Sequence, residues 1–180
     1  MITPADVTLA LITEADLPVL RELAGAIWRQ HYTGIIPAAQ IEFMLMARFD
    51  DESLREQLRA KDRWLELLRV SGTPVGYCSC ELADAESGKT APSALKLGQL
   101  YVLESHRRRG LGGIMLRHVD RRARALGSST LWLQVNKRNT GAIGFYRAAG
   151  FEVIREAVFD IGGGFVMDDY VMAKQVAAGS

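Results

Sequence analysis

The stretch LKLGQLYVLESHRRRGLGGIMLRHVDRRARAL, residues 95–126, joins two apolar patterns through a short segment rich in arginine and glycine. Residues 95–103 form an apolar run of strand length, which is typical of a central β-strand. From residue 111 onward, apolar side chains recur every three or four positions, as on one face of a helix. The stretch therefore predicts a buried strand, a turn and an amphipathic helix that begins near Gly110.

The turn between these elements carries the pattern R-x-x-G-x-G, made by Arg107, Gly110 and Gly112, and Gly113 follows. Glycines leave the backbone N–H groups uncovered at the start of the predicted helix. Those N–H groups have no acceptor inside a helix, and the helix dipole places positive partial charge beside them, so the turn suits a phosphate group. Arginines at all of residues 107–109 add further positive charge.

Other glycine-rich phosphate loops do not fit this turn. A P-loop requires a Gly-Lys-Ser/Thr triplet, which the sequence lacks, and Met115 stands where a dinucleotide fingerprint would need its last glycine. The alternative is a basic helix start that is simply solvated.

The composition is that of an ordinary globular protein, with 180 residues of which 48% are hydrophobic and 24% are charged. We therefore expect a single domain over residues 1–180. The formal net charge of +1 gives no reason to expect nucleic acid or a membrane as a partner. The arginines crowd between residues 107 and 124, and this local charge suits a small polyanionic ligand better than a duplex.

Cys78 and Cys80 are separated by one residue, a spacing that matches neither a C-x-x-C redox pair nor a zinc site. We expect two buried thiols in a reducing compartment and no metal ion. The first residues lack a positively charged leader pattern, and no uninterrupted apolar segment approaches about 18 residues. These observations predict a soluble cytoplasmic protein.

The remaining chain alternates strand-like and helical patterns. Thr13 and Asp16 have the spacing of a capping box, and Gly150 is placed to end a helix in the left-handed conformation. The polar segment between Ala83 and Ala94 is expected to be an exposed loop without chemistry. Strands are predicted at residues 7–11, 64–70, 75–82, 130–135, 151–159 and 165–173. Further helices are predicted from the Thr13 capping box to residues 31–34, from Pro37, from Asp51 and from Asn139. Residues 95–135 thus form a predicted βαβ unit.

A second motif follows this unit: N-x-x-N-x-x-A-I-x-F-Y-x-x-x-G-F, residues 136–151. It resembles motif B of the GCN5-related N-acetyltransferase (GNAT) family, and the R-x-x-G-x-G turn resembles motif A of that family. The resemblance implies an α/β (α+β) fold with a central mixed, mostly antiparallel sheet of six to seven strands, helices on both faces and a βαβ core that binds acetyl-CoA. Residues 1–62 would form the acceptor side, residues 63–126 the motif A region, and residues 127–174 motif B with the C-terminal strands.

In this family the turn wraps the pyrophosphate of acetyl-CoA, and the preceding strand hydrogen-bonds the pantetheine arm through its backbone. A backbone N–H near Val102 or Leu103 would meet the acetyl carbonyl. Tyr146 matches the tyrosine that protonates the departing thiolate in this family. A phenol suits this role because it keeps its proton near neutral pH. The alternative is that its ring only packs between helix and sheet. The resemblance assigns cofactor binding to Tyr101, Val102, Leu103, Arg107, Arg108, Arg109, Gly110, Leu111, Gly112, Gly113, Asn139 and Tyr146.

The general base is less clearly marked. A primary amine with a pKa of about 10 is mostly protonated at neutral pH, so a base or a water chain must accept its proton. Histone-type relatives use a glutamate for this step, but Lys96 stands at its place. Glu81 is our candidate, acting through water, and Glu104 is a second one. Either can instead be an ordinary surface carboxylate.

His31 and Tyr32 lie in the region where the family binds the acceptor, although a histidine at a helix end is more often solvated. Glu42, Asp168 and Asp169 could attract a cationic amine by charge complementarity. Neighbouring residues on a strand face opposite sides, so only one aspartate of the pair can point at a substrate, and Asp168 is our candidate.

The sequence therefore favours an N-acetyltransferase that moves the acetyl group of acetyl-CoA to a primary amine of a small molecule. The Gly34-Ile35-Ile36-Pro37 segment and residues 167–172 resemble the bacterial polyamine N-acetyltransferases. Acetylation of a protein N-terminus or lysine shares the same motifs, and a non-catalytic acyl-CoA sensor is a third reading. The expected partner is a small amine acceptor. Homodimers are common in the family.

Overall fold

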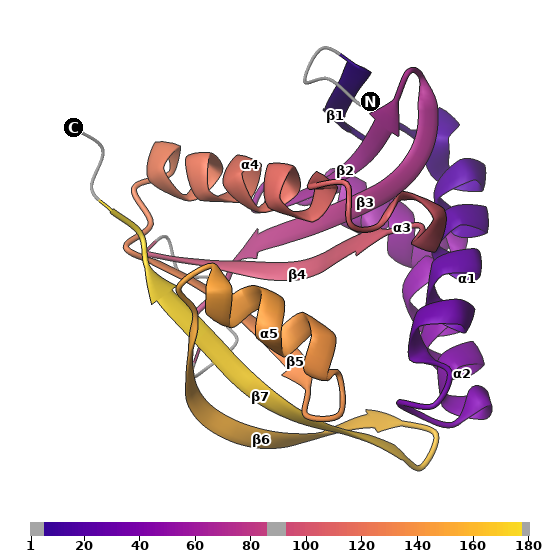
Figure 1. Cartoon of the computed structure of the whole chain (residues 1–180). Coiled ribbons are helices and arrows are strands. Elements are labelled where there is room, and N and C mark those ends of the chain that lie inside the picture. The colour runs from indigo at the N-terminus through magenta and orange to yellow at the C-terminus, as the bar shows by residue number, and fades with distance from the viewer. Residues whose placement is uncertain (1–5, 86–92, 178–180) are drawn as a thin grey trace. The chain divides into compact units, whose positions relative to one another are not determined.

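The computed structural model describes residues 6–85 and 93–177 (Figure 1). The helices are α1 (Leu17–Tyr32), α2 (Ala38–Phe49), α3 (Asp51–Arg59), α4 (Leu111–Ala125) and α5 (Thr140–Ala148), and short 3-10 helices lie at Glu14–Asp16 and Glu104–His106. The strands are β1 (Val7–Leu11), β2 (Arg63–Val70), β3 (Thr73–Leu82), β4 (Ala94–Val102), β5 (Thr130–Asn136), β6 (Glu152–Gly162) and β7 (Phe165–Gln175).

Within the described residues, the seven strands form one sheet in the order β1-β2-β3-β4-β5-β7-β6. Strands β4 and β5 are parallel, with Ala94 opposite Thr130 and Leu97 opposite Leu133, and α4 connects them. Pairing is antiparallel between β1 and β2, between β5 and β7, and between β6 and β7. The βαβ unit and the mixed, mostly antiparallel sheet predicted from the sequence are confirmed.

By density of contacts the chain divides into two compact units. The first comprises Met1–Cys80 and Gln99–His118, and the second comprises Glu81–Gly98 and Val119–Ser180. The expectation of a single domain stays a prediction.

In the first unit, the predicted capping box precedes α1. The Thr13 amide and hydroxyl both donate to the Asp16 carboxylate, at 2.9 and 2.8 Å. Asp16 also accepts from Arg69 of β2 at 2.6 Å, which joins the start of the helix to the sheet. Helix α1 then buries one continuous stripe made of Leu17, Leu20, Leu23, Ala24, Ile27 and Trp28.

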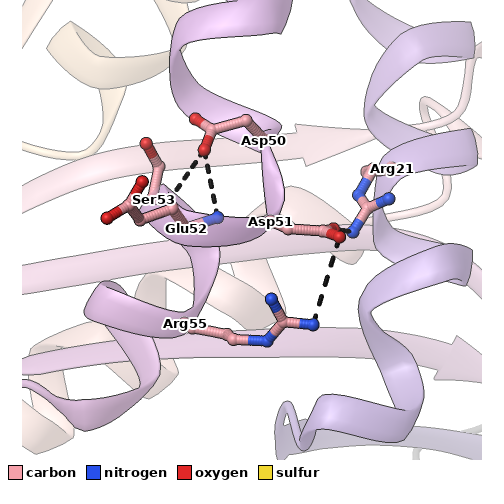
Figure 2. Close-up of polar contacts among 6 residues, drawn as sticks. All are labelled: Arg21, Asp50, Asp51, Glu52, Ser53 and Arg55. Carbon is pink, nitrogen blue, oxygen red and sulfur yellow. Dashed lines mark hydrogen bonds and ion pairs between the residues drawn. The ribbon is translucent and has the colours of Figure 1, made fainter.

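Helix α3 is held at its start by Asp50, whose carboxylate accepts from the amides of Glu52 and Ser53 at 3.0 and 3.1 Å (Figure 2). Asp51, the first helical residue, forms ion pairs with Arg21 of α1 and with Arg55 (Figure 2). The cap satisfies two amides that have no acceptor within the helix. The ion pair with Arg21 attaches α3 to α1, whereas the pair with Arg55 lies within α3.

The second unit is built on β5, β7 and β6. Trp132 of β5 and Val171 of β7 pack with Ala83 and Ala94 in a buried cluster. The hairpin between β6 and β7 turns through glycines at 162–164, all with positive φ angles. Both strands extend beyond their predicted ends: β6 pairs as far as Gly162, opposite Phe165, and β7 continues to Gln175, opposite Thr130 of β5.

Other expectations have mixed outcomes. Cys78 and Cys80 are both free and buried, as predicted. The ends of the segment expected to be an exposed loop are instead buried, because Ala83 and Ala94 pack in the apolar cluster with Trp132 and Val171. The Ala83 amide also donates to the Ala94 carbonyl at 3.1 Å, and residues 86–92 of the segment lie outside the described residues. Among the helices described, none has both the length and the apolar content needed to cross a membrane.

Candidate active site

Helix α4 is preceded by an exposed turn with an unusual backbone. Arg108 and Gly110 adopt left-handed conformations, with φ angles of 59° and 78°. All four residues from Arg107 to Gly110 are exposed. A left-handed residue costs energy unless it is glycine, so Arg108 in particular marks a turn whose shape is imposed by its surroundings.

The first amides of α4 follow this turn. The Ile114 amide donates to the Gly110 carbonyl at 3.1 Å, which is the first hydrogen bond of helical type. The amides of residues 111–113 precede that bond, so helical geometry provides them no acceptor within the helix. The Leu111 side chain is buried and anchors this end of the helix. With two glycines following Leu111, the helix mouth presents backbone donors and positive dipole charge suited to a diphosphate.

Arg107 turns back from the helix mouth toward the sheet and α1. Its Nε donates to the Val102 carbonyl at 3.3 Å, and its Nη2 donates to Nδ1 of His31 at 3.2 Å. The three arginines of the turn therefore differ: Arg107 contacts other parts of the first unit, whereas Arg108 and Arg109 extend from the exposed turn.

The end of β4 distinguishes the two amides that were expected to meet an acetyl carbonyl. The Leu103 amide donates to the Val75 carbonyl of β3 at 2.8 Å, so it is already engaged. Because successive N–H groups along a strand point to opposite edges, the Val102 amide points away from β3. Of the two amides expected to meet an acetyl carbonyl, Val102 is the one whose direction fits.

Strand β3 lies very close to β4 at Gly76. A Cβ atom at this position would lie 2.5 Å from the Tyr101 carbonyl oxygen and 3.3 Å from the Val102 Cα. Only glycine permits such an approach of two backbones.

An aromatic cluster surrounds the end of α1. The hydroxyls of Tyr32 and Tyr101 lie 2.6 Å apart, and Trp28 Nε1 donates to the Tyr77 hydroxyl at 2.6 Å. The His31 ring packs edge-on against the rings of Tyr32 and Tyr101, with centroids 5.0 and 6.0 Å apart. Burial raises the pKa of both Tyr77 and Tyr101 well above the ordinary phenol value, so both remain protonated near neutral pH.

His31 is a neutral imidazole in this arrangement. Burial lowers its pKa below the ordinary value, and the charge of Arg107 lowers the pKa further. Because a guanidinium can only donate, Nδ1 of His31 accepts, and the ring proton lies on Nε2. His31 can therefore offer a hydrogen-bond donor through Nε2, but it is poorly suited to take up a proton.

The two carboxylates considered as general bases have different surroundings. Glu104, in the first unit, accepts a hydrogen bond from Gln30 of α1. Glu81, in the second unit, lies 3.7 Å from the Lys96 ammonium in a partly buried ion pair. The ammonium also lies 5.0 Å from the centre of the Trp132 ring, so Glu81 belongs to a packed charged group rather than to a freely solvated surface.

Motif B forms strand β5 and helix α5 in the second unit. The Asn139 side chain accepts from the Ala142 amide at 3.3 Å and caps α5, as predicted. Gly150 has a φ angle of 89° and follows the helix in the left-handed conformation, also as predicted. Tyr146 is half-buried, and its ring packs edge-on against Phe151 with centroids 5.6 Å apart. Ring packing of Tyr146 is thus present, and its role as an acid stays a prediction.

Two of the acidic residues expected to attract an amine, Glu42 and Asp168, are paired with cations of the chain. Asp168 lies 2.6 Å from Lys137, which also contacts Glu156 at 2.7 Å. These two carboxylates raise the pKa of Lys137, with Asp168 the larger cause. Glu42 likewise pairs with Arg29 at 2.7 Å. Asp168 is 56% exposed along its side chain while Asp169 is buried, which confirms that the two face opposite sides.

The predicted residues thus divide between the two units. The first unit brings together His31 and Tyr32 of α1, Tyr101, Val102 and Leu103 at the end of β4, and the turn and helix mouth from Arg107 to Gly113. The second unit holds Glu81, Asn139, Tyr146 and Asp168. Among the residues described, no three His, Cys, Asp or Glu side chains gather as a metal site would require.

Sequence reasoning missed Trp28, Val75, Gly76 and Tyr77. A glycine within an apolar strand pattern is a signal of close backbone approach, and it would have singled out Gly76. The contacts of Trp28 and Val75 join segments distant in the chain, and no local pattern reports them.

Comparison with known proteins bears on these features. A family model described as the acetyltransferase (GNAT) family matches residues 26–151. An uncharacterized N-acetyltransferase of Lactobacillus delbrueckii subsp. lactis is 24% identical over 156 residues, covering 87% of this chain and 90% of the relative. The paia N-acetyltransferase of Thermoplasma acidophilum, solved with coenzyme A, has a TM-score of 0.77 at 21% identity, covering 94% of this chain and 98% of that chain. The spermidine N-acetyltransferase of Vibrio cholerae, solved with CoA and spermine, has a TM-score of 0.65 at 14% identity and 96% coverage of both chains.

Proposed function

Because the chain belongs to the acetyltransferase (GNAT) family and is an acetyl-CoA-dependent N-acetyltransferase, we propose that it acetylates a primary amine of a small molecule by direct attack. One observation carries this proposal: the first unit combines the first amides of α4, which directly follow an exposed turn, with a Val102 amide that points away from β3. The first feature suits a diphosphate, and the second suits the carbonyl oxygen of an acyl group.

The helix mouth has the donors that the diphosphate of acetyl-CoA requires. We assign binding of the diphosphate to the amides of Leu111, Gly112 and Gly113 and to the charges of Arg108 and Arg109. Bound acetyl-CoA supplies a thioester whose carbonyl carbon accepts the amine. The same proposal assigns to cofactor binding the backbone of Tyr101, Val102 and Leu103, the backbone of Arg107 and Gly110, and the side chains of Asn139 and Tyr146.

The Val102 amide would polarise the acyl carbonyl. Charge develops on that oxygen as the amine attacks, and a fixed backbone donor stabilises the charge without having to reorganise. The neighbouring peptide is held in place, because the Leu103 amide donates to Val75 and the Val102 carbonyl accepts from Arg107. The donor is therefore preorganised, which is the property that electrostatic catalysis needs.

We further propose that Tyr146 gives its phenolic proton to the departing thiolate. A phenol is protonated near neutral pH, and packing of its ring against Phe151 restricts where the hydroxyl can lie. Tyr146→Phe keeps the ring and removes the proton, so kcat should fall by about a hundredfold or more while the fold is retained. An unchanged kcat would remove Tyr146 from the acid step.

For the base, Glu81 acting through water remains our proposal. Its ion pair with Lys96 is partly buried, and this contact restricts where the Glu81 carboxylate can lie. Glu81→Gln should lower kcat/KM most strongly at low pH, where little of the amine is already deprotonated. A pH profile that keeps the wild-type shape would transfer this role to Glu104 or to solvent.

The acceptor is proposed to be a primary amine of a small molecule, and polyamines are the more specific class of acceptor that we propose. His31, Tyr32 and Asp168 are the residues proposed to bind it. A polycation would have to share Asp168 with Lys137, because their ion pair is already formed. This cost disfavours strong electrostatic capture at Asp168, and it makes the hydroxyls and rings at the end of α1 the more promising contacts for a neutral amine.

A panel assay tests the proposal. The purified protein is incubated with acetyl-CoA and with spermidine, amino acids or peptides, and release of free thiol is followed. Turnover with small amines but not with peptides is expected. Turnover with peptides alone would replace the small acceptor by a protein N-terminus or lysine, and cofactor binding without turnover across the panel would indicate a sensor.

Two further assignments belong to this proposal. We place the protein in the cytoplasm, where the free thiols of Cys78 and Cys80 would stay reduced. We also propose a homodimer, because homodimers are common in the family, and analytical ultracentrifugation of the purified protein would test this proposal.

A further inference from the structure

We infer that Arg107 is a positioning residue: its guanidinium fixes the end of β4 against the last turn of α1, and it is not one of the arginines that bind phosphate. The inference rests on the proposed acetyl transfer beside Val102. It separates the first arginine of the R-x-x-G-x-G turn from the two that follow it in the chain.

The contacts of the guanidinium support this role. Nε donates to the Val102 carbonyl at 3.3 Å, and Nη2 donates to His31 Nδ1 at 3.2 Å. One planar group thus joins a strand end to a helix end, and the two partners lie on segments far apart in the sequence. The Arg107 amide also donates to the Glu104 carbonyl at 3.1 Å, so the residue is held by its backbone as well as by its side chain.

The bridge acts on the peptide group between Val102 and Leu103. The carbonyl of that peptide accepts from Arg107, and its N–H donates to Val75 at 2.8 Å. Held on both sides, the peptide cannot rotate without losing a hydrogen bond. Its orientation sets the direction of the preceding Val102 amide, which is the donor proposed to meet the acyl carbonyl. A displacement of about 1 Å at such a position can cost roughly a hundredfold in rate.

His31 gives the bridge a second consequence. The bridge requires a neutral imidazole, because a protonated ring would repel the guanidinium and would have no lone pair on Nδ1. Tyr32 of α1, Tyr101 of β4 and Arg107 all face the ring, and none of these three side chains carries a negative charge near neutral pH. The last turn of α1, proposed to contact the acceptor, is therefore linked to the strand that presents the acyl group.

A lysine could not form the same bridge. The guanidinium offers donors in a flat fork that reaches two acceptors in different directions, whereas an ammonium is a compact charge on a flexible stem. Arg107→Lys therefore keeps the positive charge but loses the two-armed hydrogen-bonding geometry. Arg108→Ala is the matched control, because it removes one arginine charge from the same turn.

The experiment compares Arg107→Ala, Arg107→Lys and Arg108→Ala for three properties. These are the Kd of CoA by calorimetry, kcat with the best acceptor, and the titration of the His31 ring by NMR. Arg107→Ala should lower kcat by about a hundredfold and leave the Kd within about fivefold of wild type. It should also raise the His31 pKa, because the neighbouring charge that opposes protonation is gone. Arg108→Ala should raise the Kd by roughly tenfold and leave His31 unchanged.

Two results would overturn the inference. One is an Arg107→Ala protein that weakens CoA binding as much as Arg108→Ala while kcat and the His31 titration stay at wild type. The other is full recovery of kcat in Arg107→Lys, which would show that charge alone is needed. If Arg107→Ala does not fold, Arg107→Lys and the His31 titration still decide the question. A wild-type protein that binds no CoA and acetylates nothing would instead defeat the proposed function, while the NMR comparison would still report on the bridge.

Discussion

Gly76→Ala would test whether the close approach of β3 to β4 sets the geometry at Val102. The new Cβ would lie 2.5 Å from the Tyr101 carbonyl oxygen and 3.3 Å from the Val102 Cα, and both of these are backbone atoms. A carbon and a carbonyl oxygen approach no closer than about 3.3 Å in ordinary structures. The two strands would therefore have to separate locally by about 0.8 Å.

This displacement has a calculable effect on the next hydrogen bond. The Leu103 amide lies 2.8 Å from the Val75 carbonyl, and an added displacement of about 0.8 Å brings the distance to about 3.6 Å, where no hydrogen bond remains. Overpacking and a lost buried hydrogen bond each cost about 1–3 kcal/mol. Because relaxation of the strands relieves part of both costs, we expect a loss of about 2–4 kcal/mol in the free energy of unfolding. A fall of roughly a hundredfold in kcat should accompany it, since the Val102 amide moves with the strand.

Urea denaturation would measure the first effect and thiol release from acetyl-CoA the second. Gly144→Ala is the matched control for stability. Gly144 is exposed in α5, and a Cβ there would meet nothing within 4 Å, so this variant should be more stable by about 0.5–1 kcal/mol. A Gly76→Ala protein with wild-type stability and wild-type kcat would mean that β3 does not press on β4 at this point, and the reasoning about Val102 would fail.

The remaining predictions concern pH and capping. Because the His31 pKa is lowered in the folded protein, chiefly by burial, only the unfolded chain takes up this proton as the pH falls below the ordinary value of 6.5. The stability that His31 contributes should therefore be complete above pH 6.5 and should decline as the pH falls from 6.5 to the lowered pKa. In His31→Gln the urea midpoint should lack this part of the pH dependence. Plots of urea midpoint against pH that run parallel for the two proteins would contradict the prediction. Asp50→Ala should lower the melting temperature, because the amides of Glu52 and Ser53 lose their acceptor (Figure 2). Hydrogen bonds, chiefly from the Ser53 side chain, lower the Asp50 pKa. The difference in melting temperature between wild type and Asp50→Ala should therefore be present above the ordinary pKa of 3.8 and vanish as the pH falls through the lowered pKa. Equal melting temperatures at neutral pH would contradict the prediction.

Most elements of the fold could be predicted because their signals are local. The βαβ unit followed from a change of apolar period near Gly110, and the caps at Thr13 and Asn139 followed from residue types at fixed spacing. Gly150 was predicted to be left-handed because few other residues take that conformation cheaply. In each case, a few neighbouring residues determine the local backbone.

The detail of the candidate site was harder to predict because its contacts are distant in sequence. Tyr32 and Tyr101 are 69 residues apart, and Arg107 and His31 are 76 apart, so no periodicity connects them. The sequence offered both Val102 and Leu103 as donors, and only the bond from Leu103 to Val75 distinguishes them. Strand register likewise decides which cations neutralise the acidic candidates, as Lys137 does for Asp168.

The central claim is that the amides at the mouth of α4 bind the diphosphate of coenzyme A. Calorimetric titration of CoA into Gly112→Asp tests it most directly, with Ala38→Asp as the control because it adds the same charge to the first turn of α2. Gly112→Asp should weaken binding at least about a hundredfold, since the new carboxylate displaces roughly two charge-assisted hydrogen bonds, and Ala38→Asp should bind as wild type does. Equal affinities in a folded Gly112→Asp protein and in the control would show that the diphosphate is bound elsewhere.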